Sequence, residues 1–87
     1  MSRMKKMHER LAVLQPTQID IKDDSHLHAG HVGARDGGGH YQLHIVSAQF
    51  EDKPTLTRHR MIYSALGDMM KQDIHALCIN AFTPEEI

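Results

Sequence analysis

The chain has 87 residues, of which 40% are hydrophobic and 24% are charged. These fractions are typical of one small folded domain over residues 1–87 and argue against a disordered chain. The net charge of -1 and the pI of about 6.7 argue against a strongly basic nucleic-acid binder, because such proteins cluster Lys and Arg against phosphates.

Cysteine usage and the lengths of the apolar runs indicate a cytoplasmic protein. Cys78 is the only cysteine, so the sequence holds no disulfide framework and no cysteine-based zinc site. A reducing compartment is the simplest interpretation. The N-terminal residues lack the apolar run of about 7–15 residues that secretory signals need, and no stretch has membrane-spanning length. We therefore expect no membrane association.

The first part of the chain predicts a helix and then a strand. Residues 3–14 place apolar side chains at helical spacing, which predicts an amphipathic helix. These apolar residues are Met4, Met7, Leu11 and Leu14. In residues 17–23, Ile19 and Ile21 alternate with polar residues, which predicts a strand with one side in water.

Residues 23–40 carry four of the eight histidines among five glycines, which predicts a long loop. The histidines are His26, His28, His31 and His40. Neutral imidazoles bind metals, but this spacing matches no standard zinc arrangement. Glycine-rich chain also holds ligands loosely, so we expect no self-sufficient metal site in the loop.

Residues 40–50 return to an alternating pattern and predict a second strand. Tyr41, Leu43 and Ile45 share one face, whereas Gln42, His44 and Val46 share the other. No helix separates this strand from the first, so an antiparallel pair is expected.

The last part of the chain predicts a helix, a strand and a short final turn. Pro54 is placed to start a helix that runs to about residue 72. Its apolar residues are Leu56, Met61, Ile62, Leu66, Met69 and Met70. Residues 74–82, "IHALCINAF", form a nearly unbroken apolar run, which predicts a strand buried on both faces. Thr83 is placed to cap a turn that begins at Pro84.

The order helix, strand, strand, helix, strand, short helix predicts an α+β fold. A right-handed crossover through the second helix makes the third strand parallel to the second. The expected architecture is a three-stranded mixed sheet with helices covering one face.

No side chains form a convincing catalytic pair. Cys78 lies within the apolar run, where a thiol is usually buried, protonated and inert. Strand alternation sends Cys78 and His75 to opposite faces. His75 alone is most simply a hydrogen-bonded core residue. We therefore expect a protein that is not an enzyme.

Three cationic side chains stand together early in the second helix. Arg58, His59 and Arg60 lie where the helix dipole does not favour positive charge. Such a placement marks a candidate surface for binding a partner or nucleic acid.

Several motifs of the sequence resemble those of the BolA family, and they span nearly the whole chain. They are "DDS" at the start of the loop, a loop histidine, "HYQLHIVSAQF", "RHRMIY", "IHAL" and "TPEE". The resemblance implies a class II KH-like fold, α-β-β-α-β-(α), in agreement with the predicted order. It also implies a monothiol glutaredoxin partner, with which family members form heterodimers that share a [2Fe–2S] cluster.

The resemblance further implies which histidines act as cluster ligands. In the family, glutaredoxin and glutathione contribute thiolates, and the BolA-like partner contributes a C-terminal histidine and a His or Cys of the variable loop. Here the C-terminal ligand falls on His75 and the loop ligand on His28, with His31 as the alternative. Histidine replaces cysteine on one iron in Rieske centres, so such ligation is chemically sound. The isolated chain is then expected to be apo.

A DNA-binding transcriptional regulator is the alternative function. Some BolA proteins are described in this way, and Arg58, His59 and Arg60 would be the binding residues. Against it stand the near-neutral charge and the lack of the GxxG loop of nucleic-acid-binding KH domains. The family's Phe-x-Gly turn is also altered, since Glu51 and Asp52 follow Phe50. The sequence leaves open whether the isolated chain forms a homodimer.

Overall fold

The computed structural model describes residues 2–24 and 39–87 and confirms the α+β fold. Among the helices in these two ranges, none combines the length and the apolar character that a membrane crossing requires. The elements, in chain order, are α1 (Arg3–Leu11), η1 (Ala12–Leu14), β1 (Gln18–Asp23), β2 (Gly39–Val46), η4 (Ala48–Phe50), α2 (Thr55–Leu66), α3 (Met69–Gln72), β3 (Ile74–Phe82) and η5 (Pro84–Glu86).

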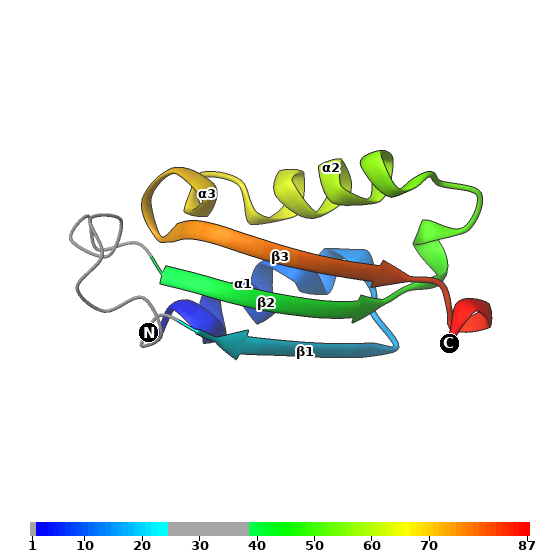
Figure 1. The fold of residues 1–87 in the computed structure, drawn as a ribbon, viewed down its shortest axis with the longest axis horizontal. Helices are drawn as coiled ribbons and strands as arrows, with labels where there is room; N and C mark the ends of the chain where they lie inside the picture. The colour runs from blue at the N-terminus through cyan, green and yellow to red at the C-terminus, as the bar shows by residue number, and fades with distance from the viewer. Residues whose placement is uncertain (1, 25–38) are drawn as a thin grey trace.

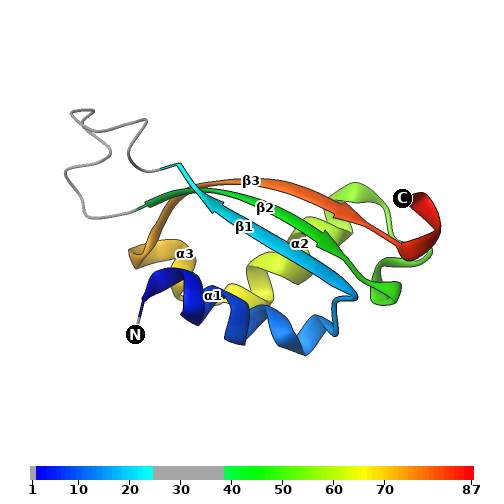
Figure 2. The same cartoon turned by 90° about the horizontal axis from the view of Figure 1, so that it is seen from below.

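The three strands form one mixed sheet in the order β1-β2-β3, as predicted. β1 pairs antiparallel with the central strand β2, and β3 pairs parallel with it. Figures 1 and 2 show that α1, α2 and α3 all lie on one side of this sheet, and no helix of residues 2–24 and 39–87 lies on its other face. The sheet therefore has a core face, which the helices cover, and an opposite face, called the open face below.

The core lies between the sheet and the helices. Tyr41, Leu43 and Ile45 of β2 point into it, which confirms the predicted alternation. Ile21 of β1 and Phe50 of η4 complete its sheet side. The helices contribute the apolar residues Met7, Leu11, Leu14, Ile62, Leu66 and Met69.

The predicted helix from Pro54 to about residue 72 is interrupted. α2 ends at Leu66, and Gly67 takes a left-handed φ of 59° before α3 begins at Met69. Only glycine adopts this conformation without a steric penalty, so the break follows from the residue type. Leu56, the first apolar residue of the predicted helix, is 62% exposed, whereas Ile62, Leu66 and Met69 are buried.

The prediction that residues 74–82 are buried on both faces was wrong. β3 is an edge strand of a sheet with one uncovered face, and only Ile74 in it is fully buried. His75, Ala76, Cys78 and Asn80 are exposed. The sequence of this edge strand resembles that of a central strand because small and apolar residues occupy its solvent-facing positions. Cys78 holds one of these positions, so its thiol is accessible and not buried.

Candidate functional site

Two histidines from different strands meet at one end of the sheet. β2 and β3 run parallel, so both strands begin there, with Gly39 paired with Ile74. The register then shifts, because His40 pairs with Ala76 and leaves His75 as an extra residue. The rings of His40 and His75 have centroids 5.1 Å apart, at an interplanar angle of 46°. Two imidazoles thus lie side by side.

Backbone contacts hold the two strand starts together. The N–H of Gly39 donates to the carbonyl oxygen of Asp73 at 2.9 Å, which links the residue before His40 to the segment before His75. A Cβ at Gly39 would lie 2.5 Å from the ring of Tyr41, so only glycine fits. The carboxylate of Asp73 lies 3.7 Å from Arg3 and from Lys6 of α1, which ties this corner to the helix layer.

His75 is exposed and not the buried core residue that its apolar surroundings suggested. The other predicted ligands, His28 and His31, lie outside the described residues, as does His26. Within residues 2–24 and 39–87, no three His, Cys, Asp or Glu side chains converge as a metal site would require. The described part of the chain therefore offers an imidazole pair that needs further ligands from elsewhere.

His40 is the residue that sequence reasoning missed as a site residue. The sequence assigned it to the polar loop and the start of a strand, whereas its ring lies against His75. The signal was present in the predicted topology. Parallel strands start at the same end of a sheet, so histidines at the starts of residues 40–50 and 74–82 should meet.

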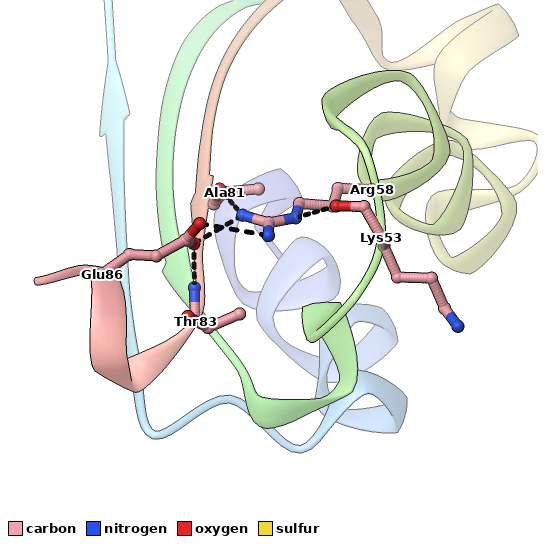
Figure 3. A network of polar contacts seen from close by, with 5 residues as sticks. All are labelled: Lys53, Arg58, Ala81, Thr83 and Glu86. Carbon is pink, nitrogen blue, oxygen red and sulfur yellow. Dashed lines mark hydrogen bonds and ion pairs between the residues drawn. The ribbon is translucent and has the colours of Figure 1, made fainter.

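Arg58 lies in a network that joins three parts of the chain (Figure 3). Its Nε donates to the carbonyl oxygen of Lys53 at 2.8 Å, and its Nη1 donates to that of Ala81 at 3.0 Å. The guanidinium also binds both carboxylate oxygens of Glu86, at 2.6 and 3.2 Å. The Arg58 side chain is only 12% exposed. This arginine therefore stabilises the fold by joining α2, the end of β3 and η5.

Glu86 completes the predicted turn after β3. Its carboxylate accepts the N–H of Thr83 at 2.7 Å, and Thr83 in return caps the turn, as the sequence predicted. The hydrogen bond from Arg58, followed by that from Thr83, lowers the pKa of Glu86 from 4.5 to about 2. The ionised form of Glu86 is thus the form that the folded chain prefers.

This lowered pKa predicts an acid-dependent contribution to stability. The contribution is complete above pH 4.5 and is lost as the pH falls towards 2, because the folded chain must then protonate a bonded carboxylate. In Glu86→Gln, urea midpoints should be lower than wild type at pH 7, and the gap should shrink at pH 3.5. A gap independent of pH would contradict this prediction, and Glu85→Gln is the matched control.

The predicted cationic group divides into residues with different environments. Arg60 is exposed and makes no hydrogen bond or ion pair with any residue that the structure describes. His59 is half-buried between Arg58 and Arg60 in α2. Arg60 is thus the arginine of this group that is available to a partner.

The altered turn after β2 keeps a conformation that suits glycine. Asp52 stands where the Phe-x-Gly pattern has glycine, and it adopts a φ of 60°. Aspartate tolerates this left-handed region better than most residues. Asp52 therefore adopts a backbone conformation that glycine would favour at this position.

Comparisons with known proteins agree with this architecture. The family model described as "BolA-like protein" matches residues 11–86. SufE-like protein 1 of Arabidopsis thaliana, described as chloroplastic/mitochondrial, is 41% identical over 99% of this chain. The match covers 25% of that protein, so this chain corresponds to a quarter of its length.

A bacterial relative and a solved structure extend the match. The protein from Haemophilus influenzae described as DNA-binding transcriptional regulator BolA is 39% identical over 83% of this chain and 67% of its own length. The solved BolA domain of SufE1 from Arabidopsis thaliana superposes with a TM-score of 0.86 at 41% identity, and the match covers 100% of this chain and 98% of that one. Family model, sequence relatives and fold agree, and this chain belongs to the BolA family.

Proposed function

We propose that this chain binds a monothiol glutaredoxin and supplies histidine ligands to a [2Fe–2S] cluster, which the two proteins share with glutathione. The observation that supports the proposal is the imidazole pair formed by exposed His75 and half-buried His40 where β2 and β3 begin. Neutral imidazoles ligate iron in [2Fe–2S] centres, where two of them can occupy one iron. The role is one of ligation and partner binding, without catalysis.

The proposed division of ligands between the two proteins starts from the imidazoles of the described residues. The described residues hold two neighbouring imidazoles and no third convergent ligand. Thiolates from glutaredoxin and glutathione would complete the set, and the isolated chain would remain apo. His75 is the proposed fixed ligand, and His28, or His31 in its place, is the proposed loop ligand. His40 lies next to His75 and is a further imidazole within reach of the same metal.

Reconstitution tests the proposal directly. The chain is mixed with a monothiol glutaredoxin, glutathione, iron and sulfide under anaerobic conditions. We expect visible absorption that differs from that of the glutaredoxin homodimer, together with a complex whose native mass equals one copy of each protein plus a cluster. A spectrum and mass identical to those of glutaredoxin alone would reject the proposal.

DNA binding is the second candidate, and it is supported by exposed Arg60 and by the bacterial relative's description. For this function, Arg60→Ala should weaken duplex binding across all sequences and reduce the salt slope by roughly one unit. Lys71→Ala is the control, because Lys71 is an exposed cation on a different helix, α3. Absence of wild-type retention on duplex DNA at low salt would remove this candidate.

A further inference from the structure

A pocket on the open face of the sheet is lined by residues of β2 and β3 and by Asp24. It has a volume of about 340 Å³, which is within the range of small-molecule sites. Asp24, directly after β1, lies on one side of it, and Cys78 of β3 lies on the other. Gln42 of the central strand lies between them, paired in register with Cys78.

Cys78 provides a nucleophile that solution molecules can reach. It is exposed in the middle of β3, and its strand neighbours Leu77 and Ile79 face the core side. A buried thiol is inert, whereas an exposed one reacts with disulfides through its thiolate form. The cysteine alone would accept any small disulfide.

The carboxylate of Asp24 gives the pocket a preference for positively charged ligands. Asp24 is only 6% exposed, and its Oδ2 accepts a hydrogen bond from the Gln42 side-chain amide. Its Oδ1 is buried and accepts no hydrogen bond from a residue that the structure describes, although it forms an ion pair with the Nζ of Lys22 at 3.8 Å. Buried carboxylate oxygens normally accept hydrogen bonds, and donors that carry positive charge bind them most strongly. Because the Lys22 side chain is 66% exposed and makes no hydrogen bond to this oxygen, a ligand ammonium in the pocket could take its place and donate to the carboxylate.

We propose that Cys78 is a thiol–disulfide exchange site selective for small disulfides that carry an ammonium group, which Asp24 binds. The Cys78 thiolate attacks one sulfur of the disulfide, and a new S–S bond forms as the old one breaks. The departing sulfur leaves as a thiolate with the bonding electron pair and takes up a proton from water. Cys78 is oxidised, and the departing half is reduced. The product is a mixed disulfide on the open face, with its ammonium at Asp24.

The geometry suits a short extended ligand. Asp24 and Cys78 flank the central strand, so a bound molecule crosses two strand spacings, or roughly 10 Å between backbones. The side chains of both residues extend into the pocket and shorten this path. A disulfide with an aminoethyl arm, such as cystamine, has the required shape. This inference concerns the apo chain and does not depend on the proposed cluster.

The test compares cystamine with neutral 2-hydroxyethyl disulfide. Intact-mass spectrometry follows adduct formation on the folded chain, and each rate is divided by the rate for free N-acetylcysteine. We expect wild type to favour cystamine by about tenfold after this correction. Asp24→Asn should remove the preference for cystamine. Asp20→Asn, a matched substitution within β1, should keep the preference, and Cys78→Ser should form no adduct.

A second measurement uses wild-type protein, so it does not depend on whether the Asp24→Asn variant folds. Salt weakens attraction between charges, so rising NaCl should reduce the wild-type preference for cystamine but not the rate with the neutral disulfide. A wild-type preference equal to that of free N-acetylcysteine would overturn the proposal. So would a preference that Asp24→Asn retains. Failure of the folded chain to react with either disulfide, while urea-unfolded chain reacts, would also overturn it.

Discussion

His75→Ala is expected to abolish the mixed-ligand cluster with glutaredoxin. His75 lies at the start of β3 between Ile74 and Ala76, which both pair with β2, so its position along the strand is fixed and no neighbouring residue of β3 can take its place. The loop ligand differs, since the sequence offers His26 and His31 close to His28. Loss of His28 should therefore weaken the cluster, whereas loss of His75 should remove the spectrum characteristic of the heterocomplex. Visible absorption and circular dichroism after reconstitution measure both effects.

Two variants separate ligation from folding. His44→Ala is the matched control, because His44 lies on the same open face but packs against Phe82, with ring centroids 5.5 Å apart. It should leave the cluster intact. His75→Cys retains a metal-binding side chain and should restore a cluster with an altered spectrum. A His75→Ala protein with the wild-type spectrum and cluster lifetime would rule out this ligand assignment.

The neighbour of His75 provides a finer comparison. His40→Ala removes the adjacent ring without removing the proposed ligand, so its effect on the cluster should be smaller than that of His75→Ala. Binding of apo glutaredoxin, measured by calorimetry, should survive in both variants, because protein contacts do not require the cluster. If a variant lost binding of apo glutaredoxin as much as it lost the cluster, the substitution would have disrupted the glutaredoxin-binding surface and not merely removed a ligand.

Hydrophobic patterns predicted the strands correctly where one face of the strand is buried and the other faces solvent. Ile19 and Ile21 in β1, and Tyr41 and Leu43 in β2, alternate as half-buried strands should, and the observed pairing agrees. β3 carries no such contrast, because Ala76 and Cys78 on its open face are small or apolar. Hydrophobicity cannot distinguish such an edge strand from a central one.

The site was less predictable because it depends on contacts between distant residues. The position of His75 came from the family resemblance, whereas its contact with His40 depends on a register shift that no local pattern reveals. The roles of Arg58 and Arg60 were likewise indistinguishable in sequence. Arg58 binds carbonyl oxygens of residues 5 and 23 positions away, and only the folded chain brings Ala81 to it.

Arg58→Ala is expected to lower the free energy of unfolding by about 2–3 kcal/mol. The substitution leaves the carbonyl of Ala81 and the carboxylate of Glu86 without their guanidinium donor, and it removes a side chain that is only 12% exposed. A domain of this size is stabilised by roughly 4–13 kcal/mol in total, so the loss is a large fraction. Urea denaturation followed by circular dichroism measures it.

The matched control for Arg58 is its neighbour two positions along α2. Arg60→Ala removes the same type of side chain from an exposed position without described partners, so the free energy of unfolding should change by no more than about 0.5 kcal/mol. Arg58→Lys should recover only part of the stability, because an ammonium cannot bind the Glu86 carboxylate through two parallel hydrogen bonds. Equal urea midpoints for Arg58→Ala and Arg60→Ala would contradict the structural role. Because Arg58→Ala perturbs the fold, a loss of DNA or partner binding in that variant is informative only when Arg60→Ala shows it too.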